Sequence, residues 1–348
     1  MSNLNSITNY KIDGHLLNSL LSIYKLIGTN NYLAEKLSSR DEAVKKNTLE
    51  ENCAILNNRL SLCDSKERSR LIITKDSKPL NLQEKSLAEL KWVLKDIEIH
   101  QSGNEPLNII DLLDYLKRIY GKHIKLNTQE YSLNNPNKKS VRYLINNLCD
   151  EYNQLRLNNA YEPIIISSIF LMEMYNLRPF DSYNEPAFLL MFYILLRKCE
   201  IMSLNYTSFY ALFLKYEIEI NEVINSGSVN YDSGVLYIND FVKLVIRMIQ
   251  ESYSIVDEMA NKVHQEKRAF KHDNITKSII EDLPRIFSKE DVKRLYPNAS
   301  DSTIVRALNS LKKKNFITPL GSGRGARWQR LIDKNSLIYL FGESNEDN

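Results

Sequence analysis

The sequence is poor in the two residues that most often interrupt helices. Its 348 residues include only 10 glycines and 9 prolines. Strand-like alternation of apolar and polar residues is rare before the last third of the chain. The longest apolar run, residues 188–196, is far shorter than the roughly 20 residues that span a bilayer. We therefore expect a mainly α-helical protein without membrane contact.

Cysteine and histidine are also scarce, with 4 and 5 residues respectively. No two cysteines form a CxxC pair, and no histidine stands at a spacing typical of zinc ligands. We therefore predict no metal site and reduced thiols, as in a cytoplasmic protein. The polar N-terminus lacks the apolar segment of a secretory signal, which agrees with that location.

Over the whole chain, basic and acidic residues nearly balance. Lysine and arginine total 46 against 43 acidic residues, which gives a formal net charge of +3. This balance favours no class of partner, so any charged binding surface has to be local. The hydrophobic fraction of 43% suffices for the cores of two or three domains.

The helical patterns divide the chain into three regions. Residues 1–104 are expected to form an N-terminal helical region, residues 105–262 a central core and residues 263–348 a C-terminal domain. In the first region, apolar residues between 87 and 97 recur at spacings of three and four, which predicts one face of an amphipathic helix. The charged stretch 261–274 is interpreted as a helix end followed by a solvated linker.

The last region has a pattern typical of a winged helix-turn-helix domain. A serine precedes the acidic turn of "SKEDVKRLYP", and Ser300 or Asp301 can cap the helix that follows. That helix places Ile304, Leu308 and Leu311 on one apolar face. Two strand-like runs, "FITPL" and "ARWQRL", come next and are joined by the glycine-rich "GSGRG".

The same region carries the local basic charge that the whole chain lacks. No acidic residue occurs from residue 302 to residue 332, which is typical of a surface that neutralises phosphates. DNA is therefore the expected partner, and docking of a partner protein is the alternative. The residues predicted to contact DNA are Ser302, Thr303, Arg306, Asn309, Lys313, Arg324 and Arg327.

A short polar stretch, "NLRPFDSYNEP", separates two very apolar segments in the central region. Proline, aspartate, serine and asparagine favour a tight turn, and turns between buried helices often hold functional residues. These are common turn residues in unrelated helical proteins as well. The candidate site in this turn consists of Arg178, Pro179, Phe180, Asp181, Ser182, Asn184 and Glu185.

Pro179, Phe180 and Asn184 resemble a degenerate form of the Fic (Fido) motif, His-Pro-Phe-x-Asp/Glu-Gly-Asn-Gly-Arg-x-x-Arg. Upstream, Ser38 and Glu42 resemble the inhibitory segment of that family, although Asp41 and Ala43 depart from its pattern. Larger bacterial proteins of the Fic family often have a C-terminal winged-helix domain as well. The resemblance implies a Fic-type helical core and an ancestry among enzymes that transfer AMP from ATP to target proteins.

The residues that would perform this chemistry are missing. Arg178 matches the histidine that acts as general base, but a guanidinium stays protonated at physiological pH. Ser182 matches the acidic ligand of magnesium, and Tyr183 and Glu185 replace the glycines that surround bound phosphates. The two motif arginines match Pro186 and Leu189. We therefore predict no catalytic residue, no cofactor, and a pseudoenzyme that acts by regulation or by DNA binding.

The alternative is a protein adenylyltransferase with a rearranged site that uses ATP and magnesium. In that case Asp181 or Glu185 would act as base or metal ligand, and Arg178 would hold phosphate.

The resemblance also implies further features of the fold. It predicts a hairpin flap over residues 121–140, and it is compatible with a homodimer. Glu42 is expected either to meet another cation, with Arg178 as the candidate, or to lie away from the motif turn.

Overall fold

The computed structural model describes residues 4, 7, 12–101, 105–131, 139–158, 161–233, 235–297, 299–321 and 327–331, with the backbone alone for residues 232 and 264–272. The chain forms two compact units, residues 1–259 and residues 260–348. The boundary between the units falls within α11 (Asn239–Glu281). The separation of a helical region from a core at residue 104 stays a prediction.

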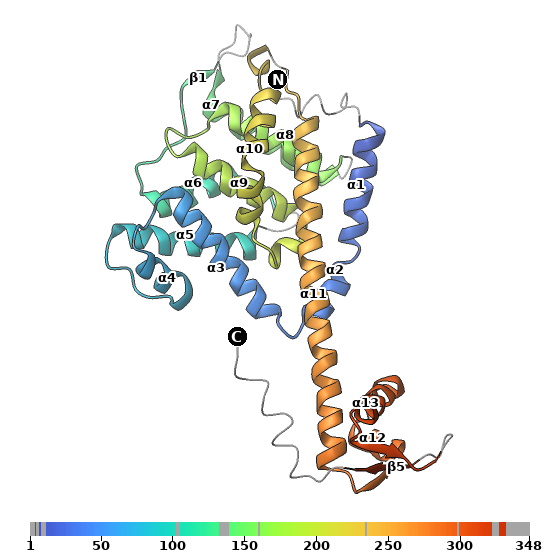
Figure 1. The fold of residues 1–348 in the computed structure, drawn as a ribbon. Helices are drawn as coiled ribbons and strands as arrows, with labels where there is room; N and C mark the ends of the chain where they lie inside the picture. Colours follow the sequence, from blue (N-terminus) through green and yellow to red (C-terminus); the bar gives the residue numbers. More distant parts are fainter. Residues whose placement is uncertain are drawn as a thin grey trace. The chain divides into compact units, whose positions relative to one another are not determined.

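The first unit is built from helices, with one short pair of strands (Figure 1). Its helices, in chain order, are α1 (Gly14–Ile27), α2 (Asn30–Leu37), α3 (Asp41–Leu60), α4 (Lys66–Lys75), α5 (Leu82–His100), α6 (Ile109–Tyr120), α7 (Val141–Asn158), α8 (Pro163–Leu177), α9 (Asn184–Lys198), the 3-10 helix η2 (Met202–Asn205), α10 (Phe209–Gly227), the 3-10 helix η3 (Tyr231–Ser233) and the start of α11. Within the described residues of this unit, no helix combines the length and apolar character that crossing a bilayer requires, and the same is true of the second unit.

Helices α8 and α9 form the centre of the first unit. Nearly every residue of both helices is buried, because both are apolar around their whole circumference. Helix α7 packs on α8, and α6 packs on α9. On α9, the Phe192 ring lies within 5.1 Å of the centroid of Phe209 and 5.8 Å of Phe241, in edge and tilted contacts that aromatic pairs favour.

The amphipathic pattern between residues 87 and 97 is confirmed in α5. The five residues of the predicted apolar face are completely buried: Leu87, Leu90, Val93, Leu94 and Ile97. This face packs against α3, α4 and α6. The helix therefore connects the N-terminal helices to the central ones.

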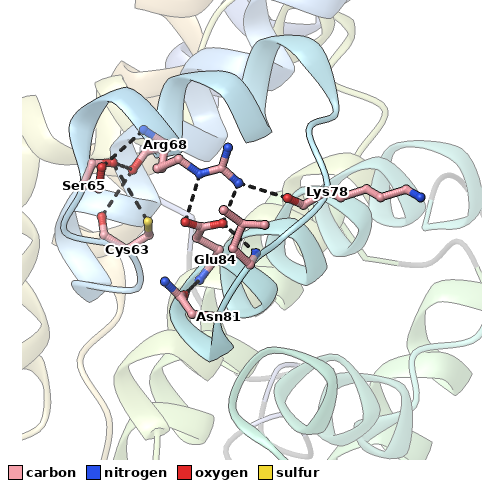
Figure 2. A network of polar contacts seen from close by, with 8 residues as sticks. Cys63, Ser65, Arg68, Lys78, Asn81 and Glu84 are labelled. Atoms are coloured by element: carbon pink, nitrogen blue, oxygen red, sulfur yellow. Dashed lines mark hydrogen bonds and ion pairs between the residues drawn. The ribbon is translucent and has the colours of Figure 1, made fainter.

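The connection from α4 to α5 is held by a polar network (Figure 2). Arg68 on α4 donates to both carboxylate oxygens of Glu84 on α5, at 3.0 and 2.7 Å, and also to the carbonyl of Lys78. The backbone N–H of Leu80 donates to Glu84 at 2.8 Å, and Asn81 caps α5. The bonds from Arg68, and next that from Leu80, hold the pKa of Glu84 below its ordinary value. The network fixes where α5 begins.

The flap predicted over residues 121–140 contains a hairpin. Strands β1 (Glu130–Tyr131) and β2 (Lys139–Ser140) pair antiparallel, and the residues between them, 132–138, lie outside the described part of the chain. Before β1, an antiparallel bridge joins Leu126 to Phe180. The flap therefore lies beside the motif turn, as predicted.

The second unit has the element order of a winged helix-turn-helix domain, which the sequence predicted. After the end of α11 come β3 (Ile286–Ser288), α12 (Lys289–Leu295), α13 (Asp301–Lys313), β4 (Ile317–Pro319) and β5 (Arg327–Arg330). The strands form an antiparallel sheet in the order β3-β5-β4. Ser288 and Asp291 form a capping box on α12, and Ser300 caps α13.

Two features of the second unit differ from expectation. The charged stretch 261–274 is helical and belongs to α11, so the predicted linker is wrong. Residues 239–281 contain no glycine or proline and many good helix formers, and charge alone does not end such a helix. Strand β3 was not predicted, because three residues are too few to show a periodic pattern.

We expect Gly227→Ala to destabilise the first unit, because a Cβ at this position would overlap the carbonyl oxygen of Tyr237 and the terminal methyl of Met172. Overpacking of this kind costs about 1–3 kcal/mol in the free energy of unfolding, measurable by urea denaturation. Gly14→Ala is the control, since a Cβ there meets no atom within 4 Å. Equal stability of the two variants would contradict this packing.

Candidate functional site

The motif turn, residues 178–183, joins α8 to α9 and has a left-handed residue at each end. Arg178 has φ 47° and Tyr183 has φ 61°, a conformation that favours glycine and asparagine. The side chain of Asn184, the first residue of α9, accepts a bond from the N–H of Phe180 at 3.0 Å and donates to the Phe180 carbonyl at 2.8 Å. The amide of Asn184 therefore closes the turn and is committed to the backbone.

The flap contributes a second set of bonds to the turn. The N–H of Asn127 donates to the carbonyl of Pro179 at 2.8 Å, and the N–H of Asp181 donates to the carbonyl of Lys125 at 3.1 Å. The Asp181 carboxylate accepts from the N–H of Lys125 at 3.2 Å and from the Ser182 hydroxyl at 3.1 Å. Asp181 thus holds the turn to the flap, and Ser182 bonds to the Asp181 carboxylate.

An arginine from α3 meets the start of α9. Arg59 donates to Glu185 through Nε at 3.0 Å and through one terminal nitrogen at 2.8 Å, and its other terminal nitrogen contacts Glu217 on α10. Partial burial disfavours the guanidinium charge, but the bonds to Glu185 and Glu217 outweigh it and hold the pKa of Arg59 above its ordinary value. Three helices therefore meet at one ionic cluster, which we call the Arg59 bridge (Arg59, Glu185 and Glu217).

The N-terminus of α9 offers little to a bound anion. No side chain among the described residues caps it, and Pro186 has no N–H in the first turn. Glu185 places a carboxylate there, where the helix dipole favours negative charge. The Tyr183 ring stacks on Tyr120 with centroids 4.1 Å apart and covers this end of the helix.

Tyr120 is itself unusual, because its hydroxyl is buried and has no hydrogen-bond partner among the described residues. Burial raises the pKa of Tyr120, and the charges of Tyr183 and Glu185 act in the same direction. The phenol therefore stays protonated over the physiological range.

A cavity of about 440 Å³ lies beside the motif turn. Of the predicted site residues, Arg178, Asn184 and Glu185 line it, together with Arg59 from α3 and Asn221 from α10. Its other walls are apolar: Met174, Tyr175, Phe188, Leu189, Phe213 and Ile224. Pro179 and Phe180 are buried, and Ser182 is not among the lining residues. The structure thus brings three of the seven predicted residues to one cavity.

The inhibitory-like segment lies elsewhere. Ser38 and Glu42 are exposed at the junction of α2 and α3. The start of α3 is tied to Tyr206, just after η2, whose hydroxyl donates to Asp41 at 2.6 Å. Because a helix rises 1.5 Å per residue, Glu42 is about 25 Å along α3 from Arg59. Of the two alternatives for Glu42, the structure supports the one in which it lies away from the motif turn.

The partners of Glu185 in the Arg59 bridge, at the start of α9, were not predicted from the sequence. Arg59 lies 126 residues from Glu185 and 158 from Glu217 in sequence. No spacing rule connects residues so far apart, so only the fold brings them together. The end of α3 therefore meets the start of α9 with an arginine, while Glu42 lies at the other end of the same helix.

The residues predicted to bind DNA lie mostly on one side of α13. Ser302, Arg306, Asn309 and Lys313 are exposed, and Thr303 is half-buried. On the opposite side, Ile304, Leu308 and Leu311 are buried as predicted. Arg327 on β5 is exposed, and Arg324 lies outside the described residues.

Another basic residue of this unit has a structural role. The guanidinium of Arg330 donates to the carbonyls of Ile280 and Leu283 at the end of α11. Within the part of the chain that the structure describes, no three His, Cys, Asp or Glu side chains are grouped so that they could hold a metal ion.

We expect Arg59→Ala to lower the free energy of unfolding by about 1–2 kcal/mol, because it leaves the exposed carboxylate of Glu185 and the partly buried one of Glu217 without their cation. Lys46→Ala on the same helix is the control. Its ammonium is 3.8 Å from Glu50 and its side chain is 66% exposed, so the expected change is below about 0.5 kcal/mol. Chemical denaturation of both variants gives the comparison, and equal losses would show that the Arg59 bridge does not hold α3.

No protein-family model matches the sequence, and neither does any curated protein. Solved structures do resemble it. A Fic domain containing signaling protein from Bacteroides thetaiotaomicron aligns with a TM-score of 0.50 and 14% identity, over 69% of this chain and 97% of that one. A Fic family protein from Desulfovibrio desulfuricans aligns with a TM-score of 0.48 and 16% identity, over 92% of this chain and 97% of that one.

At such identities the likeness concerns the fold and not the chemistry. The match to the Bacteroides protein covers most of this chain, and the structure has the helical core and small β flap that the motif resemblance predicted. The chain therefore has the Fic fold.

Proposed function

We propose that this Fic-fold protein does not transfer AMP and acts by binding duplex DNA through its C-terminal unit. The observation that carries the proposal is the surface of α13, where polar and basic side chains are exposed opposite a buried apolar face. A helix of this kind, followed by a β-hairpin, can enter the major groove. The sequence around it contains no acidic residue from 302 to 332.

The geometry of the motif turn supports the loss of transfer activity. A general base needs a pKa near working pH, and Arg178 at the matching position keeps its proton. The carboxylate of Asp181 accepts one hydrogen bond from the flap, from the N–H of Lys125, and one from the Ser182 hydroxyl, and that of Glu185 is paired with Arg59. Both candidates for a replacement base are therefore engaged in contacts that hold the fold together.

The start of α9 supports the same conclusion. Backbone N–H groups at a helix N-terminus commonly bind phosphate. Here the first turn contains Pro186, which has no N–H, and Glu185, whose charge repels a triphosphate. An adenylyltransferase would need phosphate contacts at this end of the helix.

Incubation with labelled ATP and magnesium tests the loss of transfer. We expect no label on the protein itself or on proteins of a cell lysate, because both candidate bases are engaged in other contacts and the first turn of α9 has a proline and a carboxylate where phosphate would bind. Label that depends on ATP and disappears in Arg178→Ala would support the adenylyltransferase alternative and contradict the proposal.

DNA binding is tested by fluorescence anisotropy with the full-length protein, using random and genomic duplexes at two salt concentrations. We expect affinity to fall with salt. Arg327→Ala should weaken binding to every sequence and reduce the salt slope by about one phosphate equivalent. Arg306→Ala or Asn309→Ala should mainly relax base preference, by about 1–3 kcal/mol per lost contact.

Lys277→Ala is the matched control, since this side chain is 61% exposed on α11 and lies outside the basic surface of α13 and β5. It should bind like the wild type. If the full-length protein shows no salt-dependent affinity for duplex DNA, the C-terminal unit is better interpreted as a protein-docking domain.

A further inference from the structure

The cavity beside the motif turn persists although the groups for ATP chemistry are missing. Its volume of about 440 Å³ falls in the usual range for small-molecule sites. Three aromatic rings, Tyr175, Phe188 and Phe213, form part of its wall. The rings of Tyr175 and Phe188 already meet edge to face at 5.7 Å, and further aromatic surface favours a planar apolar group.

The polar and charged side chains that line this cavity differ in whether they already have a hydrogen-bond or ion-pair partner. Arg59 is paired with Glu185 and Glu217, and the amide of Asn184 is committed to the backbone of Phe180. The side chain of Arg178 is exposed and has no hydrogen-bond or ion-pair partner among the residues that the structure describes. Arg178 is therefore the charged group at the cavity that can bind a ligand without breaking an existing contact.

The backbone of Arg178 is also held in an unfavourable conformation. It ends α8 with φ 47° and ψ 68°, where a glycine would be favoured. The bridge of the flap to Phe180 and the amide of Asn184 hold the turn and fix this geometry. Strain of this kind is often found where a side chain has to be presented to a ligand.

We propose that the cavity binds a small monocarboxylate with an aromatic body, whose ring packs against the apolar walls and whose carboxylate pairs with Arg178. A guanidinium binds a carboxylate through two parallel hydrogen bonds. A single negative charge balances Arg178. Further negative charge would be repelled by the Arg59 bridge, whose two carboxylates outnumber its one cation. This inference rests on the proposed function, because it requires that the cavity is not a nucleotide site.

The test uses the full-length protein and isothermal titration with 3-phenylpropionate. We expect saturable binding with a dissociation constant on the order of 1 mM or below, as for other ligands of this size. The uncharged amide, 3-phenylpropanamide, should bind at least about tenfold more weakly, because it lacks the charge-assisted bonds. Equal affinity of acid and amide, or no binding of the acid, would overturn the inference.

The variant Arg178→Gly tests whether a loss of ligand affinity occurs without a loss of stability. A glycine relieves the left-handed strain, so the melting temperature should stay equal or rise, while affinity for the acid falls by about tenfold or more. Arg142→Ala is the control, since this exposed arginine on α7 does not line the cavity and should leave affinity unchanged. Unchanged affinity in Arg178→Gly would contradict the role of Arg178.

A titration with ATP and magnesium distinguishes the two proposals. If ATP binds and displaces 3-phenylpropionate, the cavity accepts a nucleotide and the inference about the carboxylate is wrong, while the loss of transfer is decided by the labelling experiment and DNA binding by anisotropy. If neither compound binds, the inference about the carboxylate is wrong, while the proposed loss of transfer activity still stands.

Discussion

The tight connection between two fully buried helices is the constraint on which the rest of the site depends. Helices α8 and α9 are buried on all sides and pack against each other. The chain therefore reverses direction within the few residues 178–183. The amide of Asn184 closes this turn, and the flap holds it through backbone bonds at residues 125–127. Because these bonds use backbone and side-chain polar groups of the turn, few remain for a substrate.

The Arg59 bridge determines which charges lie at the N-terminus of α9. In the motif that the turn resembles, glycines leave this end of the helix open to phosphates. Here the carboxylate of Glu185 stands in that place, favoured by the helix dipole and paired with a cation from α3. We propose that the Glu185 carboxylate takes the place of the anion that the motif binds. The apolar cavity beside it and the uncommitted Arg178 remain accessible to a different kind of ligand.

Local patterns predicted the parts of the structure that depend on neighbouring residues. The buried face of α5, the faces of α13 and the capping serine of α12 follow from periodicity and from the bonding needs of helix ends. The motif resemblance located the turn and the flap. The Arg59 bridge and the stack of Tyr120 on Tyr183 could not be predicted, since they join distant segments. The similarity of residues 38–42 to an inhibitory segment left two places open for Glu42, and the structure has it exposed at the start of α3, away from the turn.

The claim that Glu185 occupies the place of a bound anion is tested most directly by isothermal titration of inorganic pyrophosphate into the wild type and into Glu185→Gly. The variant removes the carboxylate, frees two bonds of Arg59 and restores the residue type of the motif. We predict no measurable binding by the wild type and saturable binding by the variant. Equally tight binding by both proteins would contradict the account.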